Sequence, residues 1–107
     1  MTTQQQSLWD EGLENTYEDR KEDTCDNRLI DLVNTDFVVL GIQDKNVGKY
    51  DAYVFTILKA RDGKEETVYS SSAVINDQLE KMDERGQFPC FARIIKTKNY
   101  YTFVPAA

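Results

Sequence analysis

Histidine is missing from all 107 residues of this chain. It is the side chain that most often moves protons near neutral pH. The chain also has no glycine-rich phosphate loop and no nucleophile placed beside a base. General acid–base chemistry would fall to carboxylates, lysines or tyrosines, and the carboxylates are concentrated in a charged N-terminal segment and on a polar helix face. We therefore expect no enzymatic activity and no cofactor.

Cysteine is also scarce, and long apolar runs are absent. Cys25 and Cys90 are far apart and match no CxxC spacing, so we interpret them as free thiols in a reducing compartment, with a single disulfide as the alternative. No apolar run reaches the roughly 18–20 residues that cross a bilayer. The polar residues 1–6 lack the apolar core of a secretion signal. We expect a cytoplasmic protein without a membrane partner.

Basic residues are scarce in the N-terminal third of the chain. Residues 1–36 contain ten acids and three bases, whereas residues 37–107 contain nine acids and ten bases, so the net charge of −6 divides into −7 and +1. Net acidity argues against nucleic-acid binding, because phosphate contacts supply most non-specific affinity. The nearly neutral C-terminal part weakens that objection. The length supports one domain.

The segment 1–26 is interpreted as an acidic arm. Trp9, Leu13 and Tyr17 are spaced for one helical face, so the arm is either disordered or an amphipathic helix that docks on the domain or on a partner. Its closely spaced acids could hold a hard cation weakly, but a solvated acidic run is the favoured interpretation, and we predict no metal site.

In the remaining residues, 27–107, the spacing of apolar side chains changes several times between strand-like and helical periods. The patterns predict one or two helical turns over 27–34, strands over 37–43, 50–60 and 65–71, a helix, and strands over 90–96 and 100–105. The helix has one apolar face, a serine cap at Ser71 or Ser72, and Gly86 in the left-handed position past its end. Gly41 suggests a bulge. This order is that of a mainly β, five-stranded OB-fold barrel with one helix between its third and fourth strands.

Alternation along the strands predicts which residues face inward. One set is small and aliphatic, and we assign it to the interior: Val38, Leu40, Ile42, Ala52, Val54, Thr56, Leu58 and Val68. The opposite set is rich in aromatic residues: Phe37, Tyr53, Phe55, Ile57, Lys59 and Tyr69. Exposed rings on adjacent strands would form a base-stacking platform. The alternative is that the aromatics form the core or are covered by the arm; the charge of Lys59 in the same row favours the platform.

The last two strands add cations. Arg93, Lys96 and Lys98 precede Tyr100 and Tyr101. Basic residues interleaved with tyrosines can follow a phosphate backbone and stack on bases. The alternative is a solubilising hairpin whose charges block strand addition. Lys45 and Lys49 could extend a basic rim.

Several segments together resemble the small OB-fold single-stranded-DNA-binding-like proteins of bacteriophages. They are Leu29–Val33 running into Phe37–Gly41, Tyr53–Leu58, Ser70–Ile75 ahead of Gln78 and Leu79, Phe88–Pro89, and Tyr100–Phe103. The resemblance covers roughly residues 29–104. It implies binding of single-stranded DNA without strong sequence preference in phage replication or recombination, in the host cytoplasm.

The predicted binding residues are aromatic and basic: Phe37, Tyr53, Phe55, Lys59, Tyr69, Arg93, Lys96, Lys98 and Tyr100. The expected partners are single-stranded DNA and replication or recombination proteins that contact the acidic arm. An open barrel edge could also pair two copies as a homodimer. The alternative function is an acidic protein–protein interaction module, or an inhibitor that imitates nucleic acid, built on the same scaffold.

Overall fold

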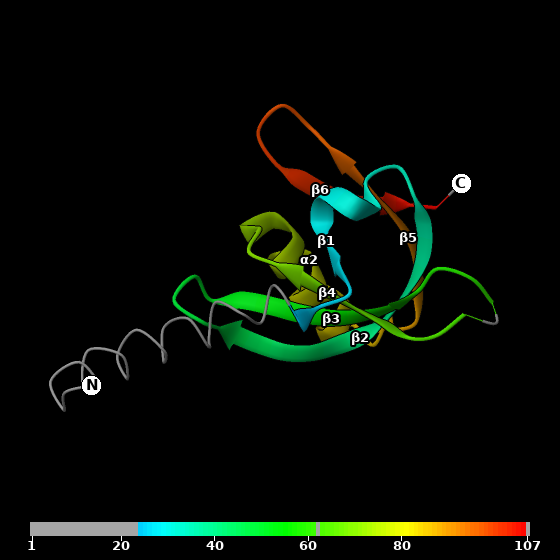
Figure 1. Cartoon of the computed structure of the whole chain (residues 1–107), viewed down its shortest axis with the longest axis horizontal. Helices are drawn as coiled ribbons and strands as arrows, with labels where there is room; N and C mark the ends of the chain where they lie inside the picture. The colour runs from blue at the N-terminus through cyan, green and yellow to red at the C-terminus, as the bar shows by residue number, and fades with distance from the viewer. Residues whose placement is uncertain (1–23, 62, 107) are drawn as a thin grey trace, which may run out of the picture.

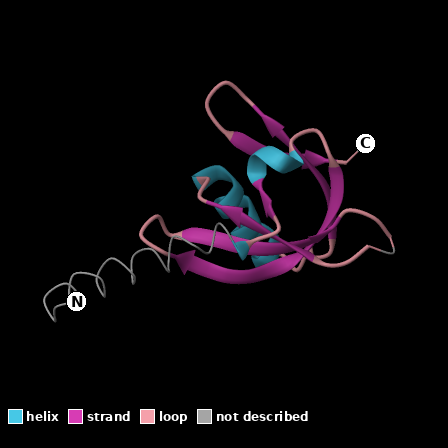
Figure 2. Cartoon of the chain, viewed as in Figure 1, coloured by secondary structure: helices cyan, strands magenta, loops and turns pink. Residues whose placement is uncertain are grey.

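The computed structural model describes residues 24–61 and 63–106, and these form one strongly curled sheet with a helix packed against it (Figures 1 and 2). The elements follow in the order β1 (Asn27–Arg28), the 3-10 helix η1 (Leu29–Leu32), β2 (Asp36–Val47), β3 (Ala52–Leu58), β4 (Glu66–Ser70), α2 (Ala73–Glu84), β5 (Cys90–Lys96) and β6 (Tyr101–Pro105). The strand order in the sheet is β1-β4-β3-β2-β5-β6. Every pairing between these strands is antiparallel except that of β1 with β4. No helix in the described ranges is long and apolar enough to span a bilayer.

The sheet has six strands, so the predicted count of five is wrong. The additional strand, β1, lies in the segment for which only helical turns were predicted; η1 confirms the turns. Residues 27–34 connect β4 to β5. Asn27 and Arg28 pair with β4, and Asn34 donates its backbone N–H to the carbonyl of Ile94 in β5 at 2.8 Å. Figure 1 shows β1 and η1 in the opening of the curl.

Strand β2 is long and bent. Its pairing with β3 shifts register between Val39 and Gly41 and twice more toward Val47, which confirms the irregularity predicted at Gly41. Its first residues, Asp36–Val39, pair with β5. Bulges increase the local twist of a strand, and β2 can therefore serve both halves of a curled sheet.

Helix α2 begins and ends where the sequence predicts. The hydroxyl oxygen of Ser72 accepts the backbone N–H of Ile75 at 3.3 Å, and Gly86 has a φ of 61°. Ile75 and Leu79 are fully buried against the sheet. The helix thereby covers one end of the core.

The predicted inward and outward faces of β2 and β3 are exchanged. The main core contains the aromatic rows, including Phe37, Val39, Phe55, Ile57 and Phe103. The rings of Phe55 and Phe103 lie 5.8 Å apart, and those of Phe37 and Phe103 lie 6.3 Å apart, in edge-to-face contacts. Large rings bury more apolar area than small aliphatic side chains, and this outweighs the pattern on which the prediction was based.

Four residues predicted for the interior are buried or packed against the core. Ile42 packs against the core because the register shift between Val39 and Gly41 turns it inward again. Val68 is buried in the core as predicted. Ala52 and Val54 are buried too, but in a second cluster with Tyr69, Cys25 and Val47. Both faces of β3 are therefore covered, which an alternating pattern does not anticipate.

Candidate nucleic-acid interface

The aromatic platform predicted on the sheet is not available for stacking. Phe37 and Phe55 are 2% and 0% exposed and belong to the main core. Tyr69 is 9% exposed and belongs to the second cluster, beside Cys25. The expected exposure of these three rings is wrong. A ring that a core encloses cannot offer a face to a base unless the domain opens.

Tyr53 is half-buried and acts as part of a polar clamp. Its hydroxyl donates to Glu80 Oε1 at 2.8 Å, and Lys45 Nζ lies 2.8 Å from the same oxygen. The hydrogen bond to Glu80 raises the pKa of Tyr53 and that of Lys45, and the hydrogen bonds from Lys45 and Tyr53 lower the pKa of Glu80. This clamp joins β2, β3 and α2, so Lys45 and Tyr53 have structural partners.

Two of the predicted phosphate contacts are already neutralised by carboxylates. Lys59 donates to Asn27 Oδ1 at 2.7 Å and lies 3.2 Å from Glu66. Lys59 follows the last residue of β3, so the charge does not lie within the aromatic row. Arg93 Nε donates to Asp36 Oδ1 at 2.6 Å, which lowers the pKa of Asp36 and raises that of Arg93.

The other three predicted residues come together on the β5–β6 hairpin. Lys96 and Lys98 form no ion pair within the described parts of the chain, and Tyr100 is 46% exposed. Lys96 Nζ also lies 5.4 Å from the ring centroid of Tyr101. We call these four residues, Lys96, Lys98, Tyr100 and Tyr101, the hairpin surface.

Thr97 fixes the shape of the hairpin turn. Its backbone N–H and its hydroxyl both donate to the carbonyl of Tyr100, at 2.8 and 3.0 Å. The same hydroxyl oxygen accepts the backbone N–H groups of Asn99 and Tyr100, at 3.3 and 3.1 Å. The turn therefore holds Lys98 and Tyr100 in a defined position relative to β5 and β6.

A groove of about 570 Å³ separates the hairpin surface from the start of α2. Its far wall consists of Leu29 and residues 71–74, and no acidic residue lines it. The first turn of α2 carries no acid either, so the positive end of the helix dipole is not cancelled there. A smaller recess lined by Arg28 and Ile30 adjoins the groove and shares Leu29, Ser71 and Tyr101 with it. The result is a continuous basic and aromatic surface.

The chain matches a family model over residues 24–104, and its description is a domain of unknown function, DUF8468. The chain belongs to the DUF8468 family. No curated protein and no solved structure matches it. The DUF8468 match includes the hairpin surface, both walls of the groove and the residues that precede β1.

Within the DUF8468 domain, Ser71, Ser72 and Arg28 are among the groove and recess residues that sequence reasoning missed as candidate ligand contacts. Their position depends on the packing of η1 and α2 beside the hairpin, a long-range arrangement without a local sequence signal. Lys49 pairs with the ring of Tyr50 at 5.1 Å, but on the β2–β3 turn, which Figure 1 shows well away from the hairpin. In the described ranges, no three His, Cys, Asp or Glu residues are grouped to hold a metal ion.

Proposed function

We propose that this chain is a non-catalytic protein that binds single-stranded DNA without strong sequence preference through the hairpin surface and its groove. The observation that carries the proposal is the gathering of Lys96, Lys98, Tyr100 and Tyr101 along a groove that contains no acid. Residues 90–106 contain three bases and no acid, although the whole chain has a net charge of −6. Phosphates and bases are the ligand groups that lysines and exposed tyrosines bind together.

We also propose that the curled sheet is a variant of the OB fold. Strands β2 to β6 follow the OB element order, with α2 between the third and fourth of them. On this assignment β1 and η1 occupy the gap where the third and fifth OB strands would pair. The β5–β6 turn is then the loop between the fourth and fifth strands, one of the loops that OB folds use for oligonucleotides. The phage replication or recombination role implied by the sequence resemblance is part of this proposal.

The buried aromatic rows change the expected binding mode. Without a sheet platform, stacking depends on Tyr100 and Tyr101, and charge contacts depend on Lys96 and Lys98 with Arg28 beside them. Contacts with two or three phosphates of a single strand give a slope of log K against log salt of about −1.4 to −2. We therefore expect weak, strongly salt-dependent binding.

Fluorescence anisotropy with labelled oligo-dT over a salt series tests the proposal. Lys96→Gln with Lys98→Gln should weaken binding and reduce the salt slope by about 1.4, because two phosphate contacts are lost. Tyr100→Ala should cost about 1–3 kcal/mol if its ring stacks on a base. The matched control, Lys49→Gln with Lys64→Gln, removes the same charge elsewhere on the surface and should bind almost as the parent does. Absence of binding at low salt, or equal losses in the two double variants, would refute the proposal.

The alternative, an acidic interaction module, depends on the arm. Most of that segment lies outside the described residues, but Asp26 is described. Its carboxylate accepts the backbone N–H of Thr67 at 2.8 Å. Removal of residues 1–23 leaves this contact and takes away most of the acids of the arm. If the chain binds DNA, the truncated form should bind oligo-dT more tightly, because repulsion of phosphate is reduced. Loss of a protein partner with unchanged oligo-dT binding would favour the alternative.

A further inference from the structure

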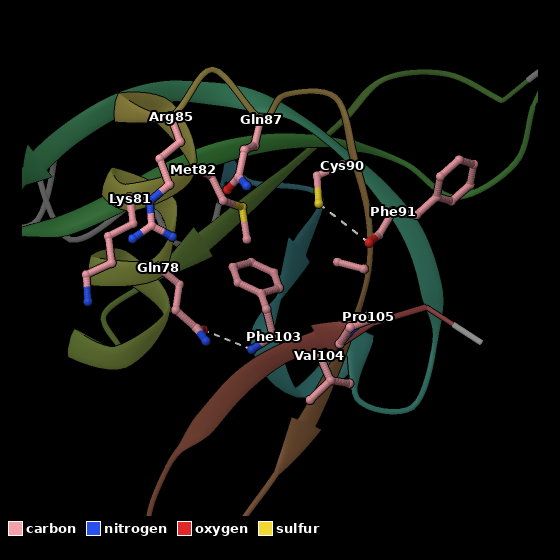
Figure 3. Close-up of a pocket in the computed structure, with 11 residues that line it drawn as sticks. Gln78, Lys81, Met82, Arg85, Gln87, Cys90, Phe91, Phe103, Val104 and Pro105 are labelled. Atoms are coloured by element: carbon pink, nitrogen blue, oxygen red, sulfur yellow. Dashed lines mark hydrogen bonds between the residues drawn. The ribbon is translucent and has the colours of Figure 1, made fainter.

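A second groove lies on another part of the molecule, between the C-terminal half of α2 and the outer edge of β6 (Figure 3). It has a volume of about 460 Å³. We call it the seam groove. Figure 3 shows Met82 pointing from the helix toward the ring of Phe103, with Lys81 and Arg85 on the same helix and Val104 on β6. The ring of Phe91 points away from the groove.

The seam groove exists because β6 has a strand neighbour on one side only. It pairs with β5 and has no partner strand on its other edge in the described sheet. Helix α2 covers this edge with one side chain. Gln78 Oε1 accepts the backbone N–H of Phe103 at 2.9 Å, and Gln78 Nε2 donates to Thr102 Oγ1 at 2.9 Å. A side chain is narrower than a strand, so space remains beside it.

The two charged residues that line the seam groove are both cations. Lys81 and Arg85 are among its lining residues, and no Asp or Glu is. Lys81 pairs with Asp77 at 3.0 Å on the exposed helix surface, which is a weak interaction in water. Arg85 forms no ion pair within the described residues. In a chain with a net charge of −6, an acid-free groove with two cations is complementary to a carboxylate-bearing guest.

The floor of the seam groove is apolar. Phe103 is 7% exposed, so only a small part of its ring borders the space. Met82, Val104 and Ala92 complete the apolar lining, and Gln87 adds an amide that can bond to a peptide backbone. Methionine adapts to irregular apolar guests. This lining suits an aliphatic or aromatic side chain, and so little exposed ring leaves a poor stacking surface for a base.

We propose that the seam groove is a docking site for a partner protein's acidic segment that carries a bulky apolar side chain. The apolar side chain lies on Met82 and Phe103, and the flanking carboxylates face Lys81 and Arg85. The site shares no lining residue with the groove of the hairpin surface, so a ligand there would not block such a partner. The proposal does not depend on the proposed function.

Fluorescence anisotropy of the full chain with a labelled synthetic peptide, acetyl-DDEFLDD-amide, tests the site. Saturable binding is expected at low salt, together with weaker binding of DDEAADD, which lacks the apolar anchor, and of the basic peptide KKKFLKK. Lys81→Gln with Arg85→Gln should weaken binding of the first peptide about two- to thirtyfold, the effect of losing two exposed ion pairs. Both side chains are exposed, so the fold should be retained, as far-UV circular dichroism can verify.

The matched control is Lys96→Gln with Lys98→Gln on the hairpin surface, which removes equal charge and should leave peptide binding unchanged. Equal losses in the two double variants, or equal binding of the acidic and basic peptides, would overturn the proposal. The proposal would also be overturned if Lys81→Gln with Arg85→Gln weakened binding of oligo-dT but not of the acidic peptide, since the groove would then be a nucleic-acid surface. If the chain self-associates with concentration and Lys81→Gln with Arg85→Gln abolishes this, the groove binds a second copy of the chain. That result would overturn the proposal too.

Discussion

Replacement of Gln78 by alanine should weaken the seam between α2 and β6. Gln78 makes two hydrogen bonds of 2.9 Å to β6, and the N–H group of Phe103 that it satisfies belongs to a residue only 7% exposed. Each such bond contributes about 0.5–1.5 kcal/mol, and a buried N–H left without a partner costs about 1–3 kcal/mol. The higher helix propensity of alanine offsets a few tenths of a kcal/mol. We expect a loss of about 2 kcal/mol, or about 8–16 °C in Tm.

Urea unfolding monitored by circular dichroism measures this loss, and Gln78→Glu is the informative control. A carboxylate keeps an acceptor for the Phe103 N–H and loses only the donor to Thr102, so the glutamate variant should lose less than half as much. Amide hydrogen exchange reports the same contact locally. The Phe103 amide should exchange faster in the alanine variant than in the glutamate variant. Equal destabilisation by both substitutions, or unchanged protection of that amide, would refute the assignment of Gln78 as the cover of this edge.

Three other predictions follow from the described contacts. Phe55→Ala should destabilise the domain by about 3–5 kcal/mol in urea unfolding, because Phe55 is fully buried; a loss below 1 kcal/mol would contradict its place in the core. The hydrogen bond from Lys45 lowers the pKa of Glu80 below its ordinary 4.5, so the charge of Glu80 stabilises the fold above that value and this contribution disappears as the pH falls through the lower, folded pKa. Glu80→Gln should therefore reduce stability near pH 7, and the difference from the parent should shrink as the pH falls below the folded pKa, as thermal unfolding across pH will show. Gly86→Ala, at φ +61°, should cost about 1–2 kcal/mol in thermal unfolding, whereas Gly41→Ala, where a Cβ meets open space, should be nearly neutral.

Local signals predicted the elements well. The Ser72 cap and the left-handed Gly86 define α2, and strand β5 spans Cys90–Lys96 as the pattern indicates. These features depend on neighbours within a few residues, so the sequence contains them directly. Strand β1 could not be predicted in this way. It has two residues, and its parallel pairing with β4 joins positions about 40 residues apart.

The exchange of faces has a physical cause that alternation alone cannot reveal. A period of two separates the two sets of side chains but does not say which set is buried. The charge of Lys59 does not mark the outer face, because Lys59 lies just beyond β3, where it pairs with Glu66. Ala52 and Val54, on the opposite face of β3, are buried in the second cluster. Neither face of this strand is therefore simply exposed. A comparison of buried areas, which favours placing Phe37 and Phe55 inside, would have given the correct assignment.

Lys96, Lys98 and Tyr100 were predictable as one candidate site because a single turn brings them together, whereas the groove beside them and the seam groove were not. Both grooves follow from the way in which the curled sheet is closed. At the β4 edge, β1 adds two paired residues, and Asp26 bonds to Thr67. At the β6 edge, the helix side chain of Gln78 takes the place of a strand. A strand pair would fill the space between β4 and β6, whereas short segments and single side chains satisfy the backbone groups and leave cavities next to them. The incomplete closure of the sheet is therefore what gives this small domain two separate basic grooves, although the chain as a whole is acidic.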